Sequence, residues 1–167
     1  MEYYIQYHNF DNLNLFPSND AIEDGSLLSD SEHVISTNKR VKIENLKGSI
    51  IFLILGLVYK GEKRYYLWSI TKVEDIHENF EPDFKFSIVG IQHFIEPPKL
   101  LNKLKSFPEF MHKSGHFGLG LQKITDWEIT KDFISISDKF QARNPTKTTY
   151  KEFVSNFSRG HKMMHNY

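Results

Sequence analysis

Residues 48–73 constrain the fold more than any other part of the chain, because they combine two apolar segments with a short polar turn. The first segment, residues 50–58, is interrupted only by Gly56. The second, residues 65–73, is rich in aromatic and β-branched side chains, which suit a pleated, half-buried surface. Between them, Gly61 can adopt the positive φ that a tight turn requires. The pattern predicts a β-hairpin that other elements must cover, at the centre of a sheet or barrel.

Shorter patterns on both sides of this hairpin predict further strands and a few short helices. Strands are predicted at residues 2–8 and 84–94, with Pro97 and Pro98 ending the second one. Short helices are predicted at residues 41–46, 99–104, 107–112 and 150–157, and a short helix followed by a strand at residues 124–137. Residues 9–32 and 74–83 are polar and predict loops, and residues 114–121, with three glycines, predict neither an ordinary strand nor a helix.

Several short strands with few short helices indicate an α+β protein, built as a small β barrel with added helices. The 167 residues suffice for one domain with a hydrophobic core. We expect this domain over residues 1–137, followed by a basic extension with a short amphipathic helix over residues 138–167.

The composition argues against several classes of protein. The chain has no cysteine, which excludes disulfides and cysteine–metal sites. Its longest apolar run is about half of the ~20 residues that a membrane helix needs. The first ten residues lack the basic and apolar regions of a secretory signal. We therefore expect a soluble cytoplasmic protein with no membrane partner.

Charge is unevenly distributed, although 21 basic residues balance 21 acidic ones. Residues 1–32 contain acids but no lysine or arginine, whereas bases gather from Lys39 onward and in the C-terminal tail. This asymmetry indicates either a basic face for an anionic partner or a solvated polar tail.

Four segments follow one another in a recognisable order. They are a first strand with paired tyrosines, the sequence HVISTNKRV, the hairpin KGSIIFLILG…KRYYLWSI, and NKLKSFPEFMHKSGHFGLGLQKI. Over residues 1–137 this arrangement resembles the EVE-like group of the PUA-like superfamily, whose relatives are the YTH and ASCH domains. The resemblance implies a small mixed β pseudo-barrel with peripheral short helices. It also implies nucleic-acid binding, with a pocket for a flipped and often modified base, and bacterial EVE-like domains are associated with restriction and other anti-phage systems.

The sequence HVISTNKR, residues 33–40, is the best candidate for a polar binding cluster. Ser36, Thr37 and Asn38 offer donors and acceptors for a base edge, and Lys39 and Arg40 offer contacts to the phosphate backbone. The resemblance implies a similar role, because in that family this segment contributes to the pocket wall. The alternative is an N-cap, in which one of the three polar residues begins a helix over residues 41–46.

Three further residues are candidate ligand contacts. Trp68 can stack on a base, but aromatic side chains in a central strand are more often part of the core. Phe117 and Gln122 belong to the glycine-rich stretch, where the first can cover a pocket and the second can read a base edge. The alternative for that stretch is a tight packing turn.

No sequence motif indicates a metal, a cofactor or a catalytic centre. The eight histidines lack HExxH and HxH spacing, so no metal ligand is predicted. The glycine-rich stretch lacks the Gly-Lys-Ser/Thr ending of a phosphate-binding loop, and there is no G-x-S-x-G motif. We therefore predict no catalytic residue and no cofactor, although a site assembled only in space leaves little trace in a sequence.

Three functions follow as alternatives. The first is a non-catalytic module that binds DNA or RNA and reads a base extruded into a pocket. The second is a small nuclease-like enzyme of a defence or toxin system. The third is a protein–protein interaction module that uses the acidic N-terminal loop and the basic tail.

Overall fold

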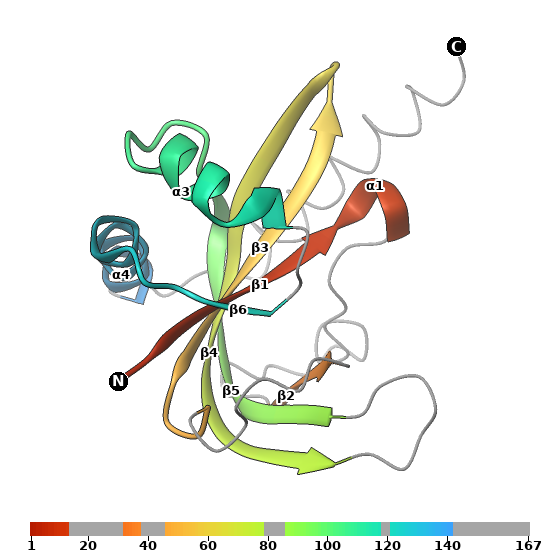
Figure 1. Cartoon of the computed structure of the whole chain (residues 1–167), viewed down its shortest axis with the longest axis vertical. Coiled ribbons are helices and arrows are strands. Elements are labelled where there is room, and N and C mark those ends of the chain that lie inside the picture. Colours follow the sequence, from red (N-terminus) through yellow and green to blue (C-terminus); the bar gives the residue numbers. More distant parts are fainter. Residues whose placement is uncertain (14–31, 38–45, 79–85, 118–120, 142–167) are drawn as a thin grey trace.

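The computed structural model describes residues 1–13, 32–37, 46–78, 86–117 and 121–141. They form an α+β structure with a six-stranded mixed sheet in the order β2-β5-β4-β3-β1-β6 (Figure 1). The strands are β1 (Tyr3–Asn9), β2 (Glu32–Thr37), β3 (Ile50–Tyr59), β4 (Glu62–Glu78), β5 (Phe86–Leu100) and β6 (Gln122–Lys123). The helices are α1 (Phe10–Leu13), α3 (Phe107–Lys113), the 3₁₀ helix η2 (Gly115–Phe117) and α4 (Trp127–Gln141). Within these ranges no helix has the length and apolar character needed to span a membrane.

The predicted hairpin is confirmed as the antiparallel pair β3 and β4. Its two-residue turn consists of Lys60 (φ 51°) and Gly61 (φ 78°), both in the left-handed region that a tight hairpin turn requires. At the other end of the hairpin, Gly48 N–H donates to Val73 O (3.0 Å) and Val73 N–H donates to Ser49 O (2.9 Å). The turn and these two bonds fix the register of the pair at its opposite ends.

The remaining strands extend this hairpin on both sides. The strand predicted at residues 2–8 is confirmed as β1, which runs parallel to β3, whereas every other neighbouring pair is antiparallel. In the described part of the chain, β2 and β6 form the outer edges and do not pair with each other, so the sheet is open. The closed pseudo-barrel expected from the sequence therefore stays a prediction.

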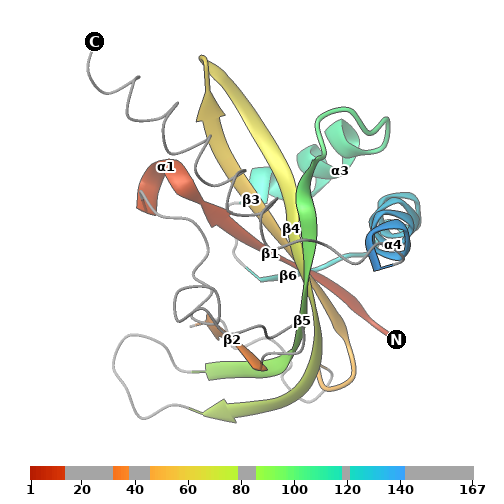
Figure 2. The ribbon, with the colours of Figure 1, turned by 180° about the vertical axis from the view of Figure 1, so that it is seen from behind.

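One face of the sheet, which we call the helix face, is covered by α3 and α4 (Figures 1 and 2). Phe52 of β3 packs there with Phe107 of α3 and Phe133 of α4 in one hydrophobic cluster. The ring centroids of Phe52 and Phe133 are 5.1 Å apart. This cluster is the main core of the described residues.

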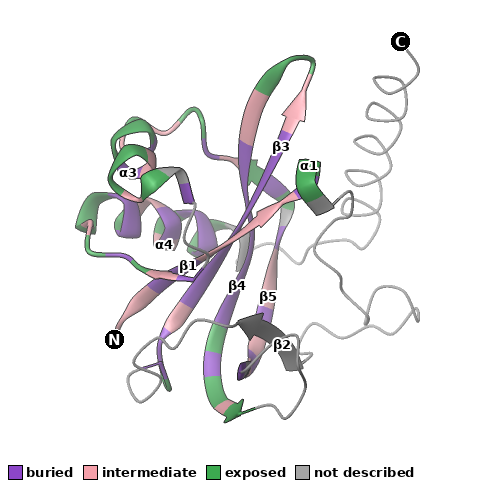
Figure 3. Cartoon of the chain, turned by 45° about the vertical axis from the view of Figure 1, so that its right-hand side comes forward, coloured by how far each residue is buried: buried purple, intermediate pink, exposed green. Residues whose placement is uncertain are grey.

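The opposite face, which we call the Trp68 face, carries two separate hydrophobic clusters. Trp68 packs with Leu53 in one cluster, and Tyr4 packs with Ile51 in the other. Because Ile51 and Leu53 alternate with Phe52 along β3, both faces of the hairpin are apolar, and the centre of the sheet is buried (Figure 3). The central hairpin is thus covered on both sides.

β4 is longer than the sequence predicts, because it runs to Glu78 through residues that were expected to form a loop from residue 74. Its last residues pair with β5 and end with Glu78 opposite Phe86. Most side chains of this part are exposed, so their polar character does not prevent strand pairing.

β5 is also longer than predicted and continues through Pro97 and Pro98 to Leu100. Residues 95–98 pair with neither β4 nor β2, so no ladder hydrogen bond needs the N–H that proline lacks. Leu100 then pairs with Tyr66 of β4. The prediction of a helix at residues 99–104 is therefore wrong.

The prediction of a helix followed by a strand at residues 124–137 is wrong in its second half, because α4 is continuous to Gln141. Ile129, Phe133 and Ile136 follow a helical spacing and are buried against the helix face. The helix predicted at residues 107–112 is confirmed as α3. Residues 115–117 form only the short η2, as the glycines of this stretch suggest.

Several predicted features lie wholly or mainly outside the described residues. They are the helices at residues 41–46 and 150–157, most of the acidic loop at residues 9–32, and the basic extension beyond Gln141. The start of the predicted loop is described and forms α1, whose Asp11 carboxylate accepts hydrogen bonds from Val58 N–H (2.9 Å) and Lys63 Nζ (2.6 Å).

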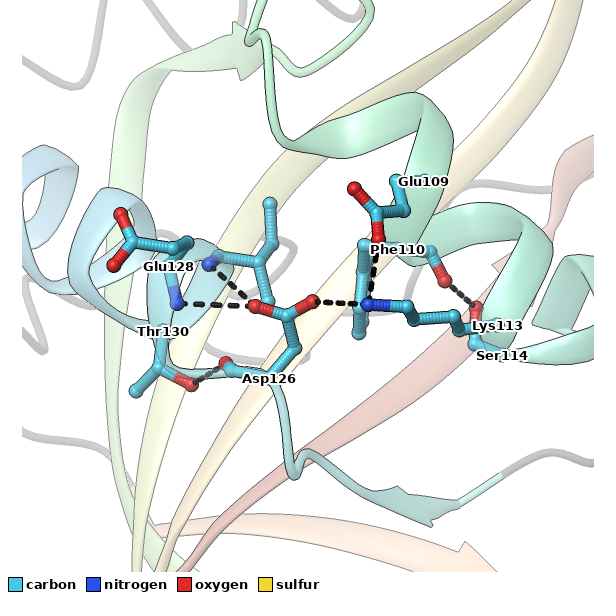
Figure 4. A network of polar contacts seen from close by, with 8 residues as sticks. Glu109, Phe110, Lys113, Ser114, Asp126, Glu128 and Thr130 are labelled. Carbon is cyan, nitrogen blue, oxygen red and sulfur yellow. Dashed lines mark hydrogen bonds and ion pairs between the residues drawn. The ribbon is translucent and has the colours of Figure 1, made fainter.

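Polar contacts join α3 to the beginning of α4 (Figure 4). Asp126 Oδ1 accepts hydrogen bonds from the N–H groups of Glu128 (3.0 Å) and Ile129 (3.4 Å), which caps α4. Lys113 Nζ lies 2.7 Å from Glu109 Oε1 and 3.5 Å from Asp126 Oδ2. Its contact with Glu109, and to a smaller extent that with Asp126, raises the pKa of Lys113.

We expect Asp126→Ala to lower the free energy of unfolding by about 1 kcal/mol, because α4 loses its cap. Asp126→Asn should cost less, since the amide oxygen still accepts the cap hydrogen bonds and an exposed ion pair contributes little. Urea unfolding of the two variants measures the difference. Equal destabilisation by both would show that the charge, not the cap, matters.

Gly56 allows the Tyr7 ring of β1 to lie against β3. A Cβ built on Gly56 would lie 2.6 Å from Tyr7 Cε2 and nearer still to the hydroxyl oxygen. Burial, with a smaller contribution from Asp11, raises the pKa of Tyr7 to about 12. The glycine in this apolar strand is therefore explained by close packing.

We expect Gly56→Ala to lower the free energy of unfolding by about 1–3 kcal/mol, because the added methyl group overlaps the Tyr7 ring. In a Tyr7→Ala background the same substitution should cost much less, because the ring is absent. A double-mutant cycle by urea unfolding measures this coupling. An equal cost in both backgrounds would contradict the overlap.

Candidate ligand-binding site

The polar cluster predicted at residues 33–40 is only partly described. Ser36 and Thr37 are the last residues of β2 at the edge of the sheet, where their backbones pair with Ser87 and Phe86 of β5. The other predicted contacts of this cluster, Asn38, Lys39 and Arg40, lie outside the described residues. The proposed roles of this segment stay predictions.

The structure does not bring the other three predicted ligand contacts together. Trp68 is 0% exposed and lies on the Trp68 face, whereas Phe117 is 1% exposed and packs into the cluster of the helix face. Gln122 lies opposite Ile5 of β1, at the edge farthest from β2. The described residues therefore contain no pocket formed jointly by Trp68, Phe117 and Gln122.

A row of polar side chains, which we call the polar belt, crosses the middle of the Trp68 face instead. Its members are Gln6, Ser69, Thr71 and Gln92. Strand register places them on one face, because Gln6 and Ser69 both lie opposite Leu53, and Thr71 lies opposite Gln92. Ser69, Thr71 and Gln92 are fully buried, with at most 2% of each residue exposed. The belt lies between the two hydrophobic clusters of this face.

A β-bulge at Trp68 creates the belt. The ladders of β4 with β3 and with β5 both shift register at Trp68, between Leu67 and Ser69. Leu67 therefore lies opposite Ile54, but Ser69 lies opposite Leu53, on the other face. Bulges re-aim side chains in this way and are frequent beside functional sites.

At the centre of the belt, one end of the Gln92 amide has no hydrogen-bond partner among the described residues. Its Nε2 donates to Ser69 Oγ (2.7 Å), while its Oε1 is buried and finds no donor in that part of the chain. Reversing the amide does not remove the problem, because the Ser69 hydroxyl can accept or donate but reaches only one end. A buried polar atom left in this state costs about 1–3 kcal/mol.

Gln6 adds a second acceptor of the same kind, since its Oε1 is also buried without a partner in the described ranges. The belt combines two amides and two hydroxyl groups, and none of its members carries a charge. Such a set suits a neutral, planar ligand that both donates and accepts hydrogen bonds. A buried water molecule could satisfy the same atoms, and competition by free nucleosides separates the two.

The sequence contains a signal for the belt, but it is easily overlooked. Ser69 and Thr71 alternate with Ile70 in the second strand of the predicted hairpin, and Gln92 interrupts the next apolar strand. Alternation alone would place Ser69 on the same face as Leu67. The bulge reverses this, and nothing in the sequence indicates its position.

Compared with protein-family models, curated proteins and solved structures, the chain shows no match in any of the three comparisons. Across the described ranges, no group of three histidine, aspartate or glutamate side chains is arranged to hold a metal ion. The case for the site therefore depends on the belt's own geometry.

Ser69→Ala alone should lower the free energy of unfolding by about 1–3 kcal/mol, because it leaves both ends of the Gln92 amide unpaired. The double substitution Ser69→Ala/Gln92→Leu should recover this loss and be nearly as stable as the wild type or more so, since both polar partners are removed together. Urea unfolding of the three proteins measures this. A double variant that is less stable than Ser69→Ala would identify the belt as a satisfied structural network.

Proposed function

We propose that this protein is a non-catalytic nucleic-acid-binding module that holds one base against the polar belt. The observation that supports this function most directly is the Gln92 amide oxygen, which is buried in the centre of the sheet and has no hydrogen-bond partner among the residues that the structure describes. A protein that retains such an atom gives up stability, and binding a complementary ligand would offset that loss.

The chemistry of the belt fits a base better than a charged small molecule. A glutamine amide presents a donor and an acceptor in one plane, which is the arrangement found on base edges. The hydroxyl groups of Ser69 and Thr71 can serve either role. Trp68 lies beside Ser69 in the chain, but its ring is 0% exposed, so a base can stack on it only after the Trp68 face opens.

The burial of the belt has a consequence for the rate of binding. Since Ser69, Thr71 and Gln92 are fully buried, a base can reach them only after the Trp68 face opens. Binding that requires a conformational change is slower than ordinary docking. Such a site would take a base that is already unpaired or extruded from its stack.

The same proposal includes the resemblance to EVE-like domains, with the described open sheet as part of a PUA-like pseudo-barrel acting in the cytoplasm. The α+β class and the apolar hairpin at the sheet centre support it. Pairing of β2 with further strand residues would be needed to close the barrel.

Binding of fluorescent single-stranded DNA and RNA, with free nucleosides as competitors, tests the function. Wild-type protein should bind at low salt, and nucleosides, including modified ones, should compete. Ser69→Ala/Gln92→Leu should weaken binding roughly 10–100-fold, which corresponds to the 1–3 kcal/mol of a specific base contact. Thr130→Val is the matched control, because it removes a buried hydroxyl on α4, away from the belt.

Two outcomes would overturn the function. One is wild-type protein that binds no oligonucleotide and no nucleoside at low salt. The other is a folded double variant whose affinity and nucleoside competition equal those of the Thr130→Val control, as expected if the belt holds only water.

A further inference from the structure

One hydrophobic cluster on the Trp68 face is more deeply buried than the described elements around it explain. We call it the Trp68 cluster, and its buried members are Phe10, Leu53, Leu55, Leu57, Tyr66 and Trp68. Trp68 and Leu55 are 0% exposed, and no buried member exceeds 6%. Neighbouring side chains on the same sheet can shield the sides of a tryptophan ring. Its outer surface stays accessible to water unless a second layer of the protein lies over it.

Among the described elements, only the short helix α1 adds a side chain to this cluster from outside the sheet. That side chain is Phe10, the first residue of the helix. The helices α3 and α4 cover the helix face instead (Figures 1 and 2), and Phe117 of η2 belongs to the helix-face cluster. One phenylalanine does not cover an apolar surface that extends over three strands. Since the burial exists in the single chain, the cover belongs to the same chain.

The segment at residues 150–157, which lies outside the described ranges, has the apolar stripe that such a cover requires. Its apolar residues recur at spacings of 0, 3, 4 and 7 and are Tyr150, Phe153, Val154 and Phe157. In a helix they share one face about 100° wide, whereas the residues between them are all polar. A helix with this pattern buries one side against an apolar surface and turns the other side to water.

The chain is long enough to bring this segment to the Trp68 face. The eight residues 142–149 join it to the end of α4 at Gln141, and eight extended residues span at most about 26–29 Å. Layers packed on opposite faces of a sheet lie roughly 20 Å apart, at about 10 Å for each packing distance. α4 contacts β5, and β2 pairs only with residues 86–91 of that strand. Within the described ranges, the rest of β5 is therefore an outer edge around which the chain can pass.

The two next-longest segments outside the described ranges fit the Trp68 cluster less well. Residues 38–45 lie between β2 and Leu46, which belongs to the other cluster of the Trp68 face. Residues 14–31 follow α1, but Pro17 and Gly25 interrupt any helical stripe, and the segment contains four acidic residues.

We infer that residues 150–157 form an amphipathic helix whose apolar stripe packs on the Trp68 cluster, so that the sheet lies between two helical layers. This inference does not depend on the proposed function, but it has a consequence for it. The polar belt lies between the two clusters of the Trp68 face, so a base that reaches the belt has to displace the layer on this face.

Fluorescence of Trp68 in the full-length chain tests the inference. The other tryptophan, Trp127, is 57% exposed on α4, so Trp127→Phe leaves Trp68 as the single reporter. In this background, Phe153→Ala/Phe157→Ala removes two members of the stripe. Glu152→Ala/Asn156→Ala is the matched control, because it changes two residues of the same segment outside the stripe.

The stripe variant should show a severalfold stronger quenching of Trp68 by acrylamide and a red-shifted emission, because water and quencher then reach the ring. The control should behave like the Trp127→Phe parent. Far-UV circular dichroism verifies the fold, which should persist because the helix-face cluster is complete without this segment. If the double variant unfolds, the single variants Phe153→Ala and Phe157→Ala replace it.

Three outcomes overturn the inference. One is equal quenching in the stripe variant and the control. Another is a loss of protection in Leu15→Ala/Phe16→Ala but not in the stripe variant, because residues 14–31 would then be the cover. The third is protection in the parent that disappears on dilution, because a second copy of the chain would then supply the cover. The quenching experiment needs no ligand, so its result is separate from that of the nucleoside and oligonucleotide experiments.

Discussion

The need to cover both faces of the β3–β4 hairpin is the physical constraint on which the rest of this structure depends. Backbone hydrogen bonds fix the hairpin, but its strands are apolar on both sides, and each exposed face would be costly in water. One face is covered by α3 and α4, whose phenylalanines pack on Phe52. On the other face, β1 and β5 contribute Tyr4 and Phe94 beside the hairpin's own Trp68. The order of the remaining elements follows from these two requirements.

Local patterns in the sequence identify the hairpin and α3, because each depends on contacts that are near in the chain, and alternation identifies β1 although its partners β3 and β6 are distant. The apolar run, Gly61 and the positive φ of the turn all favour the same antiparallel hairpin. The predictions that fail in β4 and β5 depend on distant pairing. Residues 74–78 are polar but form a strand because β5 lies beside them, and Leu100 extends β5 because Tyr66 is its partner. Composition carries no information about such partners.

The same difference between local patterns and long-range pairing applies to the candidate site. Trp68 is a conspicuous residue in the sequence, and its full burial agrees with the core alternative. The atoms that support a binding site belong to less conspicuous residues, Ser69 and Gln92, which are distant in the chain and joined by one hydrogen bond. Asn102 is similar, since only the structure reveals that its amide connects the segment after β5 to β4. The polar groups of this site come from residues that are distant in the chain and meet only in the folded protein. A sequence motif describes one continuous segment and therefore does not reveal them.

The bulge at Trp68 exchanges the faces of the sheet on which the odd- and even-numbered side chains of β4 lie. Before it, the odd-numbered Tyr65 and Leu67 face the helices, and after it the even-numbered Ile70 does. A strand of the same sequence that alternated regularly through Trp68, without the bulge, would turn Ser69 and Thr71 into the phenylalanine-rich layer under α3 and α4, and Ile70 onto the opposite face. The bulged backbone at this one position thus decides which side of the sheet is apolar and which carries the polar groups.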